Sequence, residues 1–162
     1  MCEVQPEIIE CFLATSPVFA QGLFIFVRME NLIGKWGGTN MYNLSPAEQL
    51  EYIHPHDVEK LKDYSYIRNM HECIANDGDF ITIAFGNDYQ FRVDRKLFDP
   101  VDAVPMFKPF EKVKLMNTKG KLEFGEIRGI HWHNNKMIFY YDVMVNDKMK
   151  GRRYYEEDLE VV

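Results

Sequence analysis

Short runs of alternating apolar and polar residues, each followed by a tight turn, dominate the last third of the chain and limit its fold more than any other feature. In the segment 137–145 every odd position is apolar, and an Asn-Asp pair follows at once. The segments 111–116 and 125–133 alternate in a similar way, with Gly129 placed where a strand would bulge. Several short strands joined by tight turns are typical of a small β-barrel. We therefore predict an all-β unit over residues 106–162.

Residues 29–105 combine two helix-start signals with one hairpin pattern. The tetrapeptide Ser-Pro-Ala-Glu at 45–48 has the residues of a capping box, and Pro55 suits the first turn of a second helix. Apolar runs at 80–85 and 89–93 flank a Gly-Asn-Asp turn and predict a β-hairpin. We expect two short helices and a hairpin here, which together with the C-terminal barrel gives an α+β fold class.

The charge of the chain changes sign at the Pro-punctuated segment 104–109, which we take as the boundary between two units. Residues 29–105 contain seven basic and thirteen acidic residues, whereas residues 106–162 contain eleven basic and nine acidic residues. The whole chain of 162 residues carries a formal charge of −6, which argues against a dedicated binder of duplex DNA. Its hydrophobic content of 46% is that of an ordinary globular protein.

Residues 1–28 admit three interpretations. The apolar run 12–27 is short for a helix that spans a bilayer, and the residues before it include three glutamates and no basic residue, unlike a signal peptide. Val18 and Ala20 nevertheless form a permissible cleavage context, so secretion stays open as an alternative, as does a true start at Met29. We expect a leader or a mis-assigned start that lacks fixed structure and is dispensable for folding.

The cysteine count favours a reducing compartment. Cys2, Cys11 and Cys73 are an odd number, and their spacing matches neither a disulfide framework nor a zinc site. We expect free thiols, no membrane association and a cytoplasmic location.

Residues 108–162 also resemble an SH3-like barrel of the Tudor/KOW type. The matching features are Gly-Glu-Ile-x-x-Ile at 125–130, an apolar third strand, and a Tyr-Tyr turn before the last strand. The chain from about residue 29 resembles an uncharacterised bacterial domain family, through His-Pro-x-Asp at 54–57 and Arg-Tyr-Tyr-x-x-Asp-Leu at 153–159. That family has no established activity, so this resemblance implies a fold and a bacterial source but no function.

Two His-x-His pairs are the candidate metal ligands. His131 and His133 share one face of a strand because side chains alternate with a period of two, and imidazole binds zinc, nickel or copper. His54 and His56 lie beside Asp57, which could complete a mixed site. No spacing of a structural zinc site is present. A helix start and two strand positions explain the pairs without a metal, and we expect no cofactor.

Two further constellations could bind a charged partner. The basic residues Lys148, Lys150, Arg152 and Arg153 are candidates for contact with nucleic acid, as in KOW-type barrels. Four acidic residues follow within 156–160, so a solvated hairpin face explains the run as well. Aromatic residues in neighbouring segments could instead form a cage for a methylated cation, although a barrel this small needs most of them in its core. They are Trp132, Phe139, Tyr140, Tyr141, Tyr154 and Tyr155.

The sequence contains no catalytic template, since it lacks the G-x-S-x-G, P-loop, G-x-G-x-x-G and H-E-x-x-H motifs. We therefore predict no enzyme activity. The lead interpretation is a non-catalytic intracellular module that binds an unidentified protein. One version is an immunity-type inhibitor whose acidic region 29–105 covers a basic toxin. The alternative is an RNA-associated module that uses the basic hairpin 148–153.

Overall fold

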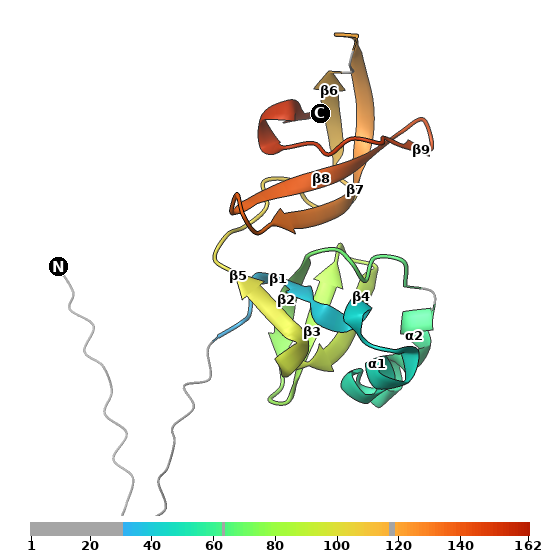
Figure 1. Ribbon diagram of the computed structural model, residues 1–162, viewed down its shortest axis with the longest axis vertical. Helices are drawn as coiled ribbons and strands as arrows, with labels where there is room; N and C mark the ends of the chain where they lie inside the picture. Colours follow the sequence, from blue (N-terminus) through green and yellow to red (C-terminus); the bar gives the residue numbers. More distant parts are fainter. Residues whose placement is uncertain (1–30, 63, 117–118) are drawn as a thin grey trace, which may run out of the picture. The chain divides into compact units, whose positions relative to one another are not determined.

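The structure of the chain is a computed structural model that describes residues 31–62, 64–116 and 119–162. The leader predicted for residues 1–28 lies outside the described residues. Two antiparallel five-stranded sheets contain most of the regular secondary structure of the described chain, and its helices are few and short (Figure 1). The predicted α+β class is therefore wrong, because this part of the chain is mostly β. None of the helices described is long and apolar enough to cross a membrane.

The first sheet contains β1 (Trp36–Thr39), β2 (His71–Asn76), β3 (Phe80–Phe85), β4 (Tyr89–Asp94) and β5 (Phe98–Val101), in the spatial order β4-β3-β2-β1-β5. The predicted hairpin is confirmed as β3 and β4, whose turn contains Gly86 at a φ of 71°, a conformation that glycine adopts readily. The sequence patterns do not predict the other three strands. β1 pairs with β2 on one side and with β5 on the other, so the sheet depends on segments far apart in the chain.

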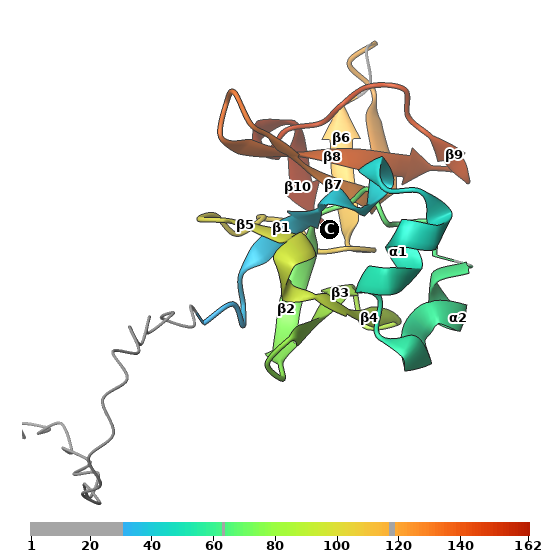
Figure 2. The same cartoon turned by 60° about the horizontal axis from the view of Figure 1, so that its bottom comes forward.

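Two short helices border the β4 edge of this sheet (Figure 2). The elements there are α1 (Pro46–Tyr52), a 3-10 turn (Pro55–Asp57) and α2 (Val58–Lys62). The predicted capping box is confirmed, because Ser45 Oγ accepts the Glu48 backbone N–H at 3.3 Å and Glu48 Oε2 accepts the Ser45 N–H at 2.8 Å. The N–H of His54 donates to the Arg92 carbonyl of β4 at 3.0 Å. The helical segment thus shields an edge that would otherwise invite strand addition.

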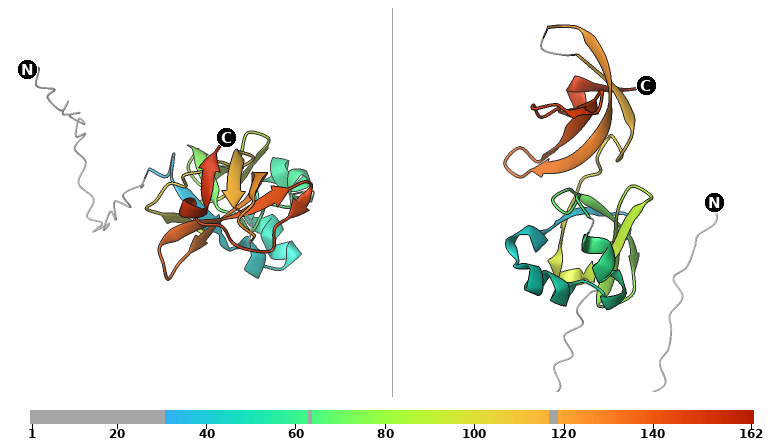
Figure 3. Two further views of the ribbon diagram at one scale, coloured as in Figure 1. Left: turned by 90° about the horizontal axis from the view of Figure 1, so that it is seen from above. Right: turned by 90° about the vertical axis from the view of Figure 1, so that its right-hand side faces the viewer.

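The second sheet contains β6 (Lys112–Met116), β7 (Leu122–His133), β8 (Ile138–Val145), β9 (Lys148–Met149) and β10 (Leu159–Val161), in the spatial order β10-β6-β7-β8-β9. The predicted bulge is confirmed, because the register of β7 against β8 shifts between Ile127 and Gly129. The long strand β7 bends along its length (Figure 3). Burial of alternate residues in β8 is confirmed from Phe139 to Val145, whereas Met137 is exposed in the preceding turn.

The predicted SH3-like barrel is not formed, because the second sheet stays open. β9 has two residues and β10 has three, and both remain edge strands. Between them, Tyr154 bridges to Tyr141 of β8, so the chain that connects β9 to β10 is tied to the middle of β8. The face that a closed barrel would turn inward packs instead against apolar residues that come from outside the second sheet.

Residues of both sheets contribute to one buried cluster. Trp36, Met70 and Phe85 pack there with the apolar residues of the second sheet, and Phe107 joins them from the connection between the sheets. A second buried cluster belongs to the first sheet and its helices alone. The Met70 N–H donates to the Ile130 carbonyl of β7 at 2.8 Å, so main-chain hydrogen bonding also joins the two sheets.

Candidate functional site

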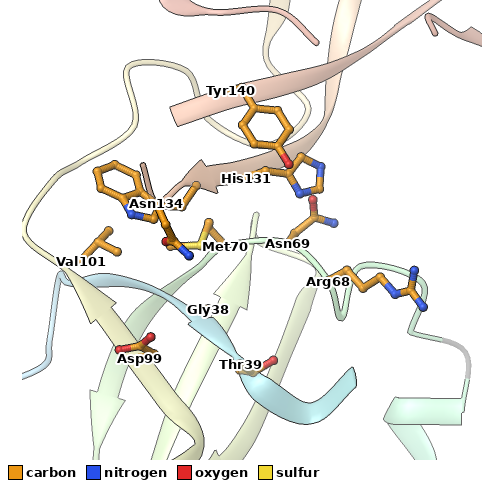
Figure 4. A pocket seen from close by; sticks show the side chains of 11 residues that line it. Gly38, Thr39, Arg68, Asn69, Met70, Asp99, Val101, His131, Asn134 and Tyr140 are labelled. Atoms are coloured by element: carbon orange, nitrogen blue, oxygen red, sulfur yellow. The ribbon is translucent and has the colours of Figure 1, made fainter. Parts of the chain in front are cut away.

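A cleft of about 460 Å³ opens at the junction of the two sheets (Figure 4). Its walls come from β1, β5 and the segment before β2, and from the end of β7 and the start of β8. Most of its side chains are polar, and they include a guanidinium, a carboxylate, an imidazole, a phenol and two carboxamides. The lining residues are Gly38, Thr39, Arg68, Asn69, Met70, Asp99, Val101, His131, Trp132, Asn134 and Tyr140.

Hydrogen bonds to neighbouring segments fix two polar side chains of the cleft. Asn69 is buried, and its Oδ1 accepts the backbone N–H of Ile130 at 3.0 Å, beside the bond from Met70 to the same residue. With the oxygen engaged, the Nδ2 amide N–H donors are the end of Asn69 left for a ligand. Thr39 Oγ1 donates to the Ile67 carbonyl at 3.4 Å. Both side chains are therefore held in place before any ligand arrives.

A histidine–carboxylate pair stands beside the cleft. Nε2 of His131 lies 2.8 Å from Oδ2 of Asp142 on β8. This hydrogen bond lowers the pKa of Asp142 below its ordinary value, although partial burial opposes the shift, and the charges of His131 and Arg153 act in the same direction as the bond. The bulged Gly129 makes room for the pair, since a Cβ there would lie 2.7 Å from His131 Nε2 and 2.9 Å from Asp142 Oδ2.

Aromatic and basic side chains stack next to this pair. The rings of Tyr140 and His131 lie 4.9 Å apart at an angle of 24°, and Arg153 Cζ is 4.8 Å from the Tyr140 centroid. Tyr155 follows at 6.5 Å from Tyr140, and Lys136 Nζ is 4.9 Å from the Tyr155 centroid. Cation–π attraction helps to hold such long side chains in place. We call these five residues, His131, Lys136, Tyr140, Arg153 and Tyr155, the rim.

The first predicted metal site, formed by His54, His56 and Asp57, has a structural role. His54 Nδ1 accepts the His56 backbone N–H at 3.3 Å, as a helix cap. The Asp57 carboxylate is buried, with Arg92 Nε at 2.8 Å and Lys60 Nζ at 2.9 Å. Burial alone would raise the pKa of Asp57, but the bonds from Arg92 and Lys60 outweigh it and hold the pKa well below its usual range. Asp57 thus anchors the helical segment to β4.

The second predicted pair, His131 and His133, lies on one face of β7. Both rings contact Tyr140, at centroid distances of 4.9 and 6.5 Å. His131 is already engaged with Asp142. Across residues 31–62, 64–116 and 119–162, no group of three or more His, Cys, Asp or Glu side chains is placed to hold a metal ion.

The four basic residues predicted to contact nucleic acid take different roles. Lys150 forms an ion pair with a glutamate of β7 at 2.5 Å, and Arg152 forms one with Asp158 at 2.8 Å. Arg153 belongs to the rim, and Lys148 is exposed on β9. Two of the four charges are therefore already compensated by neighbouring carboxylates.

The predicted aromatic cage separates into core and surface residues. The buried members are Phe139, Tyr141 and Tyr154. Tyr140 and Tyr155 are half-buried, each with a cation of this chain over its ring, and Trp132 lines the cleft. The two half-buried tyrosine rings thus already hold cations from the protein itself.

Sequence reasoning misses four polar residues of the cleft: Arg68, Asn69, Asp99 and Asn134. They belong to no motif, and three of them lie in loops between elements. Only the pairing of β1 with β5 and the contact of Asn69 with β7 bring them together. The one signal in the sequence was the glycine in β7, which marked the bulge but not the cleft beside it.

A model of a family of unknown function, DUF6960, matches residues 29–160. The chain belongs to this family. The match agrees with the resemblance to an uncharacterised domain family over the same region. Neither the search of curated proteins nor the search of solved structures found a match. Membership of DUF6960 supplies no activity, so the function has to be argued from the cleft and its rim.

Proposed function

We propose that this member of DUF6960 is a non-catalytic protein-binding module and that the rim is its main contact surface. The observation that carries the proposal is the stacked arrangement of Tyr140, Tyr155 and Arg153. Tyrosine and arginine are enriched among the residues that dominate binding energy at protein interfaces. Because ring contacts already restrict these side chains, little conformational entropy remains to be lost on binding.

The chemistry of the cleft supports binding in preference to catalysis. His131 and Asp142 have the arrangement of a base and the group that orients it, but covalent catalysis also needs a nucleophile within hydrogen-bond reach of the base. The hydroxyl groups among the lining residues belong to Thr39 and Tyr140. Thr39 donates its proton to a backbone carbonyl, and the ring of Tyr140 stacks on the ring of His131.

A more specific version of the proposal is an immunity-type inhibitor of a basic toxin in the bacterial cytoplasm. Its support is the excess of acidic residues in the region 29–105. Negative side chains around an interface accelerate encounter with a basic partner, while the central aromatic contacts set the affinity. Exposed acidic residues on the helices and turns of the first sheet are Glu48, Glu51, Glu59, Asp77, Asp79 and Asp88.

The test begins with tagged full-length protein in its native host, retained partners being identified with and without nuclease. The dissociation constant of the purified complex is then measured for Tyr155→Ala and Arg153→Gln. We expect each to weaken binding by about tenfold or more, as at a hot spot. The matched controls are Tyr52→Ala, which truncates a half-buried tyrosine of α1, and Lys148→Gln, which removes a charge from the same hairpin. These two should bind as the unaltered chain does.

Two results would overturn the proposal. Equal weakening by the rim variants and their controls would remove the rim as the contact surface. Retention that disappears after nuclease treatment, and that weakens in Lys148→Gln as much as in Arg153→Gln, would replace the protein partner with RNA.

A further inference from the structure

Two exposed charged side chains of opposite sign line the cleft. Arg68 precedes β2 and Asp99 lies in β5, and Figure 4 shows them apart from one another along the cleft. Neither forms an ion pair with another side chain in the described part of the chain. Other charged side chains in this region do form pairs: Lys35 pairs with Asp102 at 2.6 Å, and His131 pairs with Asp142 at 2.8 Å.

The lining around the two charges suits a small molecule. Asn69 offers its amide N–H groups and Asn134 its carboxamide, while Met70, Val101 and Trp132 supply apolar contact. A volume of about 460 Å³ lies within the range of small-molecule sites, about 300 to 1,000 Å³. Such sites combine apolar walls with a few polar groups that fix orientation.

We propose that the cleft binds a small dipolar molecule, a free amino acid or a short peptide, with its ammonium group at Asp99 and its carboxylate at Arg68. A guanidinium recognises a carboxylate through two parallel hydrogen bonds, and a carboxylate accepts the N–H groups of an ammonium. A ligand with one charge would contact only one of these two side chains. This inference concerns the two charged lining residues of the cleft and does not depend on the protein contact proposed for the rim.

The experiment titrates the full chain with L-leucine and with the dipeptide L-alanyl-L-leucine, followed by tryptophan fluorescence. The chain has two tryptophans, of which Trp132 lines the cleft and Trp36 is buried in the core, so a ligand in the cleft acts on Trp132. We expect saturable binding of at least one probe below about 10 mM. Its N-acetylated form and its C-terminal amide should each bind about tenfold more weakly or worse, because each lacks one of the two charges.

Two variants assign the ends of the ligand. Arg68→Gln should abolish the preference for a free carboxylate over the amide and keep the preference for a free amine. Asp99→Asn should abolish the preference for a free amine over the N-acetylated form and keep the preference for a free carboxylate. Lys96→Gln and Asp88→Asn, which alter exposed charges outside the cleft, should preserve both preferences.

The proposal is overturned if neither probe gives saturable binding, or if the blocked forms bind as well as the free ones. It is also overturned if Arg68→Gln and Asp99→Asn leave both preferences intact. A failure of this kind is distinguishable from a failure of the protein-binding proposal, because the rim variants Tyr155→Ala and Arg153→Gln are measured against a protein partner and not against these probes.

Discussion

The two sheets contain the same number of strands but are stabilised by different kinds of contact. The first sheet brings together distant segments, and polar groups such as His71 and Asp57 are buried within it or at its helical edge. In the second sheet β6, β7, β8 and β9 follow one another as neighbours, and its buried face is mainly apolar. The difference shows that one chain can specify one sheet mainly by local alternation, and another by an apolar cluster combined with a few buried polar contacts.

The strongest test of this difference is Asp57→Ala. The change leaves Arg92 Nε and the Arg92 backbone N–H without their acceptor. Removing one partner of a buried ion pair costs about 3 kcal/mol at the lower end of the usual range. We take this lower value because the Arg92 side chain is partly exposed. We expect that loss in the free energy of urea unfolding.

The matched control for Asp57→Ala is Asp102→Ala, which removes the exposed partner of Lys35. It should leave the unfolding midpoint unchanged. Equal losses in the two variants would mean that the buried polar anchor contributes no more to the first sheet than a surface ion pair does.

A smaller change in the free energy of unfolding is expected when the pH falls, because of His71. Burial lowers the pKa of this histidine to about 3, and the backbone of Asn69 offsets only part of that shift. The unfolded chain binds the proton with a pKa of about 6.5, so the stability is complete above that value and is lost as the pH falls from there toward 3. The free energy of unfolding should drop by roughly 2 kcal/mol between pH 7.5 and pH 5 from this group alone.

Urea unfolding of the unaltered chain and of His71→Gln at both pH values measures the contribution of His71. Glutamine keeps a polar group opposite the Tyr64 hydroxyl, which lies 2.6 Å from His71 Nε2, and it does not titrate. The drop should shrink in the variant. If it persists at full size, other groups carry the pH dependence of the first sheet.

The smallest of these effects is expected in the second sheet, from Gly129→Ala. A Cβ at this position collides with the His131–Asp142 pair. Both partners are partly exposed and can shift, so we expect a loss of about 1 kcal/mol, at the low end of the cost of overpacking. Gly151→Ala adds a Cβ in open space and should cost less. Similar values for the two variants in urea unfolding would show that the bulge does not have to be glycine.

The elements that the sequence predicts are those with local signals. The alternation in β8, the bulge in β7, the hairpin of β3 and β4 and the capping box of α1 all depend on residues close together in the chain. β1 gives no strand signal because Gly37 and Gly38 interrupt it, and β2 (HECIAN) gives none because its residues do not alternate regularly between apolar and polar. Gly37 is needed there, since a Cβ would lie 2.6 Å from the Asp99 carbonyl of β5.

The predicted sites likewise depend on signals between residues close together in the chain. Lys148, Lys150 and Arg152 stand out in the sequence as a charge run, but the ion pairs of the last two become visible only in the fold. Arg68 and Asp99 attract no attention in the sequence, because each is a single charged residue in a polar stretch. What brings them into one cleft is the pairing of β1 with β5 and the hydrogen bonds between residues 69–70 and Ile130.

The two hydrogen bonds at Ile130 affect how the molecule melts. One runs from the Met70 N–H to the Ile130 carbonyl, and the other from the Ile130 N–H to Asn69 Oδ1. They join the floor of the cleft to β7 beside the cluster that both sheets share. Neither sheet can unfold alone without breaking them and exposing Trp36 and Met70, so both sheets should melt in a single transition. A molecule held in the cleft would then raise the melting temperature of the whole described chain, by an amount that grows with the logarithm of its concentration.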